Sequence, residues 1–137
     1  MLATTAASPL ELEPWSNRGP FRIDFAAAPD ASAPDGYDYT RLGTPLEVAK
    51  PDLVAPDCVT VPFSVGTVLT NHAFCGTLAA VPAIAGAAAL LESAGFTRSR
   101  VLKALRSTAI PLGATGWNPG YGLGLADAYA AWQSGGL

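Results

Sequence analysis

The sequence predicts a mixed α/β protein in which helices cover a sheet. Three observations support this class. Half of the 137 residues are apolar and only 14% are charged, so the chain can form a packed core. Short stretches rich in β-branched residues precede three helical patterns along the chain. The 14 glycines and 12 prolines indicate many turns between short elements, and this order of elements is typical of helices laid on a sheet.

The N-terminal third of the chain predicts little regular structure. Residues 2–7 predict a short strand. The polar segment 15–20, WSNRGP, predicts a loop, because Gly19-Pro20 is a strong turn signal. Residues 24–45 are rich in proline and small polar residues, so we expect a long surface loop there.

The middle of the chain predicts a strand followed by the clearest helix. Residues 58–63, CVTVPF, alternate as a strand does, and residues 64–74 predict a loop with a short strand at its centre. The helix should begin with Thr77 as N-cap, and Gly95 should stop it at its C-terminal end. Because this helix is apolar nearly all round, we expect it to be buried.

Two further helices are predicted towards the C-terminus. Thr97 is a suitable N-cap for a helix that ends before Pro111, with apolar and basic side chains on opposite faces. The apolar face comprises Val101, Leu102 and Leu105, and the basic, solvated face comprises Arg98, Arg100, Lys103 and Arg106. Residues 125–133 predict the last helix, and its stripe of Leu125, Ala128, Tyr129 and Trp132 should pack into the core.

Charge and hydropathy argue against two classes of partner. The chain has 8 Lys plus Arg against 11 Asp plus Glu, so it offers no basic patch for nucleic acid. The segment 58–91 contains no charged residue, but it is rich in Ala and Gly and lacks basic flanks. These features favour a core helix over a membrane span. The first ten residues have neither a basic region nor a long apolar region, so no signal peptide is predicted.

Few residues offer metal or nucleophile chemistry. Two cysteines and one histidine are too few for a structural zinc site, although a single bridge between Cys58 and Cys75 stays open. A Cys75–His72 pair is the less favoured alternative to a small apolar cysteine beside a loop histidine. The spacing of three nearby aspartates matches no calcium loop, so a solvated acidic loop is favoured. These aspartates are Asp30, Asp35 and Asp38.

One longer segment carries a family resemblance. Residues 76–90 read GTLAAVPAIAGAAAL, and they resemble the nucleophile segment of subtilisin-like serine proteases (peptidase S8, subtilases), G-T-S-x-A-x-P-x-(V/I)-A-G-x-A-A-L. The matching residues include Gly76, Thr77, Ala80, Pro82 and Gly86, and Leu78 stands where that family has its nucleophilic serine. Three flanking segments are also similar to family motifs, namely WSNRGP, KPDLVAPD (with Asp57 where glycine is usual) and residues 113–131.

The resemblance implies a fold and an activity. The fold would be the C-terminal portion of a subtilisin-like, three-layer domain with a parallel sheet, in which residues 1–137 form one partial domain and 21–47 a loop insertion. The activity would be serine-type endopeptidase, a hydrolase of polypeptides. The family's catalytic Asp and His lie in an N-terminal half that this chain does not contain. Since Leu78 has no hydroxyl, the resemblance implies a pseudoenzyme fragment that is inactive as it stands.

Further properties follow from the resemblance. The expected partners are a polypeptide substrate or the missing N-terminal half of the domain, with no nucleic acid and no membrane. No cofactor is expected; family members often bind calcium, but no site is assignable here. A secreted or periplasmic location is suggested. Two alternatives are a stand-alone pseudoprotease remnant that binds peptides or other proteins and, less favoured, a small membrane-associated protein.

Overall fold

The computed structural model describes residues 2–3, 10–34, 36–65 and 68–135, and it has a mixed α/β fold as predicted. The strands are β1 (Leu2–Ala3), β2 (Glu11–Leu12), β3 (Phe21–Pro29), β4 (Tyr37–Val48), β5 (Val59–Val65) and β6 (Val68–Phe74). The helices are α1 (Thr77–Ser93), α2 (Arg98–Ser107) and α3 (Ala128–Ser134). Residues 4–7 of the expected N-terminal strand lie outside the described residues.

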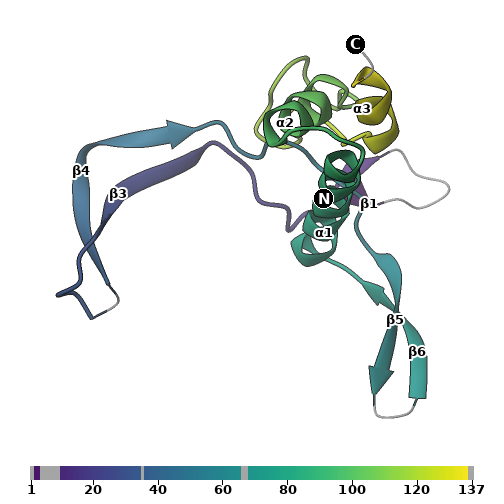
Figure 1. Cartoon of the computed structure of the whole chain (residues 1–137), viewed down its shortest axis with the longest axis horizontal. Coiled ribbons are helices and arrows are strands. Elements are labelled where there is room, and N and C mark those ends of the chain that lie inside the picture. Colours follow the sequence, from purple (N-terminus) through teal and green to yellow (C-terminus); the bar gives the residue numbers. More distant parts are fainter. Residues whose placement is uncertain (1, 4–9, 35, 66–67, 136–137) are drawn as a thin grey trace.

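The strands form three separate antiparallel pairs, β1 with β2, β3 with β4 and β5 with β6. Within the described part of the chain, the parallel pairing is a single bridge between Val54 and Leu125, and no parallel three-layer sheet is formed. The β3–β4 and β5–β6 hairpins project from the helical body in different directions (Figure 1). The helices therefore form the compact part of the fold, and the hairpins extend from it as arms.

The β3–β4 hairpin corrects the expectation of an irregular loop over residues 24–45. Phe21, Ile23 and Phe25 occupy every second position of β3, which is the period of a strand. Pro29 stands at the end of β3, and Pro45 lies at the place where β4 shifts register against β3. Both are positions that a two-stranded ribbon tolerates, so the prolines concealed a hairpin without preventing it.

The β5–β6 hairpin confirms the strand predicted over residues 58–63 and extends it. Most of the loop expected over 64–74 is strand β6, paired residue by residue with β5. Cys58 and Cys75 flank the two strands and form the disulfide that the sequence left open. The bridge closes the base of the hairpin immediately before α1.

The ends of α1 follow from two glycines. The helix begins at Thr77 as expected, but its N-cap is Gly76, one residue before the predicted cap. Gly76 has φ 101°, a conformation that a side chain disfavours. At the other end Gly95 has φ 92°, and the Phe96 amide donates to the Leu91 carbonyl at 3.1 Å. This geometry is the glycine-terminated helix end that the sequence predicted.

The expectation that α1 is buried was wrong for this chain. Ala79, Ala80 and Leu91 are buried, whereas Leu78, Val81 and Leu90 are 75%, 58% and 70% exposed. One face of α1 packs on the other helices and on residues 53–55, and none of the described elements covers the opposite face. None of the described helices is long and apolar enough to cross a membrane.

The core lies between the three helices. Its buried residues are Leu91, Val101, Ala104, Leu105 and Ala131, and Leu53, Ile84, Ala87, Ala88 and Phe96 pack around them. Helix α2 confirms the predicted N-cap Thr97 and the inward positions of Val101 and Leu105, although Leu102 is 55% exposed.

The predicted packing of the last helix was wrong. Helix α3 begins at Ala128 with Asp127 as N-cap, and the Asp127 side chain accepts a hydrogen bond from the Ala130 amide at 2.8 Å. Tyr129 and Trp132 are exposed, and their rings lie 6.0 Å apart. The small Ala131 occupies the buried position instead, in the cluster with Leu91 and Leu105.

Asp52 links the segment before β5 to helix α2. Its carboxylate accepts hydrogen bonds from Lys50 and Arg106. Burial raises the pKa of Asp52, but the hydrogen bonds from these two cations outweigh burial, and the pKa lies below its ordinary value.

Lowering the pH should therefore remove the contribution of Asp52 to stability. A carboxylate with a depressed folded-state pKa stabilises the fold above its unfolded pKa of ~3.9 and loses that effect as the pH falls through the folded value. We expect Asp52→Asn to lower the melting temperature at pH 7 and to make little difference near pH 2. Thermal unfolding across this pH range tests the expectation. Asp24→Asn, which removes the exposed Arg22–Asp24 pair, is the control and should change stability by less than ~0.5 kcal/mol.

Candidate functional site

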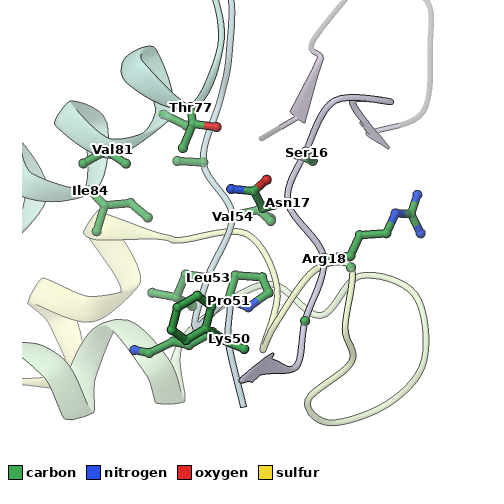
Figure 2. A pocket seen from close by; sticks show the side chains of 15 residues that line it. Ser16, Asn17, Arg18, Lys50, Pro51, Leu53, Val54, Thr77, Val81 and Ile84 are labelled. Atoms are coloured by element: carbon green, nitrogen blue, oxygen red, sulfur yellow. The ribbon is translucent and has the colours of Figure 1, made fainter. Parts of the chain in front are cut away.

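A cavity of about 340 Å³ lies beside the N-terminal end of α1. It is lined by parts of the four segments that carry the family resemblance, which are far apart in the sequence. They are Ser16–Gly19 with Phe21, then Lys50, Pro51 and Leu53–Ala55, then Thr77, Ala80, Val81 and Ile84 of α1, together with Gly120. Figure 2 shows Thr77, Val81 and Ile84 on one side of the cavity and Ser16 and Asn17 on the other, with Arg18 extending away from α1.

The segment 113–126 holds the loops around this cavity together. The Gly19 amide donates to the Pro119 carbonyl at 2.9 Å, and the Trp117 indole donates to the Pro51 carbonyl at 2.9 Å. The first bond joins two backbone groups, and the second joins the Trp117 side chain to a partly buried backbone carbonyl. Residues of the segment 113–131 therefore hydrogen-bond to the loop 15–20 and to the segment 50–57, and hold both in place.

The position that the resemblance aligns with the family's nucleophile lies in the first turn of α1. A hydroxyl placed there would sit close to free backbone N–H groups, which favour negative charge. Leu78 occupies it and points an aliphatic side chain to solvent, being 75% exposed. The adjacent Thr77 does carry a hydroxyl and lines the cavity. Pro82 lies just after the first turn and has no N–H to donate to the Leu78 carbonyl.

Asp57 fixes the loop that leads into α1. Its side chain is 2% exposed, and Oδ1 accepts hydrogen bonds from the Gly76 amide at 2.5 Å and the Cys58 amide at 2.7 Å. Its other oxygen, Oδ2, is buried without a hydrogen-bond partner. The sequence showed Asp57 only as a departure from the family's glycine. Its neighbour Cys58, which pairs with Cys75 next to Gly76, was the signal that could have revealed the contact.

The other candidate residues do not assemble into a reactive pair. His72 lies on β6, where its Nε2 is 2.7 Å from the Thr70 hydroxyl, and its ring meets the edge of Phe63 at 6.4 Å. It makes no pair with Cys75, whose sulfur is taken up by the disulfide. A histidine on an exposed strand replaces the loop histidine that we expected.

Among the described residues, Asp30 and Asp38 belong to no group of possible metal ligands. Asp30 accepts hydrogen bonds from the Ser32 amide and hydroxyl, which lower its pKa, and Asp38 lies on β4. Asp35 lies outside the described residues. The one group of possible metal ligands among the described side chains is Asp57 with Cys58 and Cys75, and both sulfurs are in the disulfide.

Comparison with known proteins assigns no family. No family model matches the chain, and no curated protein matches it. The functional proposal therefore rests on the residues around the cavity and at the start of α1.

Gly86 of the nucleophile segment allows a test of what surrounds α1. A Cβ added at Gly86 would meet no atom within 4 Å, because this face of the helix is open. Gly86→Ala should therefore raise the free energy of unfolding by ~0.5–1 kcal/mol through helix propensity. Gly76→Ala is the contrasting variant, and we expect it to be destabilising at φ 101°. Chemical denaturation checks both, and a destabilising Gly86→Ala would mean that a layer covers this face.

Proposed function

We propose that this chain is the C-terminal part of a subtilisin-like catalytic domain and that it has no endopeptidase activity as it stands. The observation that carries the proposal is the convergence of the matching segments. The loop 15–20, the segment 50–57 and the helix that begins at Thr77 line one cavity, although more than fifty residues separate the first from the last. Independent segments that resemble one family and also meet in space support a common origin.

The chemistry at the helix start explains the predicted inactivity. In acyl transfer a hydroxyl attacks the scissile carbonyl, a histidine takes its proton, and backbone N–H groups hold the developing oxyanion. Leu78 offers no hydroxyl for the attack. The single histidine of the chain, His72, bonds to Thr70 on a hairpin and is not directed at the start of α1. The N–H groups of the helix start are the one part of this machinery that the chain supplies.

The open face of α1 supports the view that another layer belongs on it. Leu78, Val81 and Leu90 expose more apolar surface than a packed helix normally leaves in water. The N-terminal half implied by the resemblance would supply such a layer. The Cys58–Cys75 disulfide supports an oxidising compartment, so the proposal includes a secreted or periplasmic location.

A second candidate function is peptide binding without cleavage. The cavity of about 340 Å³ lies at the lower end of the ~300–1,000 Å³ typical of ligand pockets. Its walls are largely apolar, with Asn17 and Thr77 as polar groups within it. Such a cavity fits one apolar side chain of a polypeptide.

Labelling with a fluorophosphonate, which reacts with activated serines, tests the first proposal. The 137-residue chain should show neither labelling nor peptide hydrolysis. Leu78→Ser in this chain should stay unlabelled, because the base is missing. The same change in the protein isolated at its natural length should introduce labelling if the upstream half is present.

Leu78→Ala is the matched control and should never be labelled. Labelling of the unaltered chain would overturn the predicted inactivity. If the natural protein is longer than this chain and folded, an unlabelled Leu78→Ser variant of it would overturn the family assignment. Binding of short apolar peptides, measured with and without Val81→Asp in the cavity wall, tests the second candidate.

A further inference from the structure

The β3–β4 hairpin has one apolar face. In the antiparallel register Phe21 faces Val48, Ile23 faces Leu46 and Ala27 faces Tyr39. Directly opposed residues point to the same side of a ribbon, and so do residues two apart along a strand. The register shifts between Ile23 and Phe25, where β4 has the extra residues, but alternate residues of β3 stay on one side across this shift. The apolar and aromatic side chains of both halves therefore gather on that side. We call this side the ribbon face, and it comprises Phe21, Ile23, Phe25, Ala27, Pro29, Tyr37, Tyr39, Leu46 and Val48, together with Arg41.

The opposite side of the hairpin carries charged side chains that suit contact with water. Arg22 faces Glu47 there, and the Arg22 guanidinium forms an ion pair with Asp24 at 2.8 Å. Nearer the tip, Ala28 faces Asp38 on the same side. The separation of apolar and charged residues onto two faces is the pattern of a strand pair with one face packed on another surface.

The described part of the chain leaves most of the ribbon face uncovered, although Phe21 also lines the cavity beside α1. The hairpin extends away from the helices (Figure 1), and β3 and β4 contact each other far more than any other described element. Phe21, Phe25, Tyr39 and Leu46 are 55–60% exposed. A two-stranded hairpin is at best marginally stable alone in water, and it gains stability when its apolar face packs against a further surface.

We propose that the ribbon face packs against the ribbon face of a second copy of this chain. This inference rests on the hairpin alone and is independent of the proposed protease relationship. In a two-fold arrangement the two apolar faces form a small sandwich, and the charged sides of both hairpins stay in water. The negative charges of the two copies, Asp24, Asp38 and Glu47, then point away from the interface.

The ribbon face is complementary to itself. Arg41 lies directly opposite Phe25, and the rings of Tyr37 and Tyr39 lie 6.5 Å apart nearer the tip. The face thus carries both a guanidinium and the aromatic rings that attract one. A two-fold axis brings the Arg41 of each copy against the rings of the other. A partner that matches the whole face must supply both aromatic rings and a cation. A second copy of the chain supplies both.

The available area agrees with a weak dimer. With roughly 150–250 Å² on each aromatic side chain, the half-exposed Phe21, Phe25 and Tyr39, together with Leu46, leave roughly 400–500 Å² uncovered on one copy. Two copies would bury about twice that from these side chains, which approaches the ~1,200 Å² at which specific interfaces begin. We therefore expect a weak, reversible dimer.

Sedimentation equilibrium of the 137-residue chain tests the proposal over a range of concentrations. The unaltered chain should dimerise reversibly. Phe25→Ser with Tyr39→Ser should weaken the dimer by about 100-fold. Ala26→Ser with Thr40→Ser changes the charged side of the same strands at the neighbouring pair, and it should leave the dissociation constant within about twofold.

Two further variants separate this dimer from other association. Leu90→Ser reduces the apolar surface on the open face of α1 and should leave the dimer intact. A photoreactive benzoylphenylalanine at position 25 keeps an aromatic ring in place, and it should crosslink to residues 21–48 of the second copy. A monomeric chain, a dimer abolished by Leu90→Ser, a face variant that dimerises normally, or crosslinks to α1 would each overturn the proposal.

Discussion

Replacement of Gly19 by alanine is expected to lower the free energy of unfolding by about 3 kcal/mol or more. A Cβ at this position would lie 1.6 Å from the Lys50 carbonyl oxygen and 3.3 Å from the Trp117 ring. The first of these atoms belongs to the backbone and cannot rotate away. The loop 15–20 would have to move off the segment that begins at Lys50, which would break the wall of the cavity.

Gly43→Ala is the matched control. Gly43 lies in the irregular part of β4, and an added Cβ would meet nothing within 4 Å. Its replacement should change stability by less than ~0.5 kcal/mol. Chemical denaturation of both variants checks the contrast. Equal stability of the two variants would show that the loop 15–20 does not lie against Lys50 in solution. The glycine of the segment WSNRGP is thus explained by the close approach of two backbones.

Local signals in the sequence predicted the helices well. Helix α2 shows why, since Thr97 at its start and the apolar spacing of Val101 and Leu105 act within three turns of chain. The same holds for Gly95, whose positive φ closes α1 through bonds to the immediately preceding turn. Caps and periodicity are local properties, so they can be read without knowledge of the rest of the fold.

Burial and strand pairing could not be predicted in the same way. The composition of α1 suggested a helix surrounded by protein, but burial depends on what else packs against it, and one face is open. Tyr129 and Trp132 form the stripe that periodicity indicated, yet Ala131 takes the buried place. The β3–β4 hairpin pairs residues up to 27 positions apart, such as Phe21 with Val48. Its alternation was hidden by the prolines.

The candidate site was predicted in part. The segments that carry the resemblance are far apart in the sequence, and the structure brings parts of all four to one cavity. The sequence left open whether Cys58 and Cys75 are bonded, because spacing does not define pairing. It also gave no role to Asp57, since the hydrogen bond to Gly76 spans 19 residues and depends on the closed hairpin.

Replacement of Asp57 by alanine is the second variant for which we expect a large effect. It would leave the amides of Gly76 and Cys58 without their acceptor in a buried place. Loss of hydrogen bonds to a charged group, together with two unsatisfied donors, should cost about 3 kcal/mol in unfolding free energy. Chemical denaturation of the oxidised protein measures this loss. Exchange of the Gly76 amide with deuterium should also become faster, because that amide would be released.

Asp57→Asn separates the role of the acceptor from that of the charge. Asparagine keeps an oxygen where Oδ1 accepts both bonds, and its amide nitrogen takes the place of Oδ2, which has no partner. We therefore expect a loss of only about 1 kcal/mol, the difference between hydrogen bonds to charged and neutral acceptors. If the asparagine variant were as unstable as the alanine variant, the negative charge would be the stabilising feature. If both variants were as stable as the unaltered chain, the disulfide alone would hold Gly76 at the start of α1.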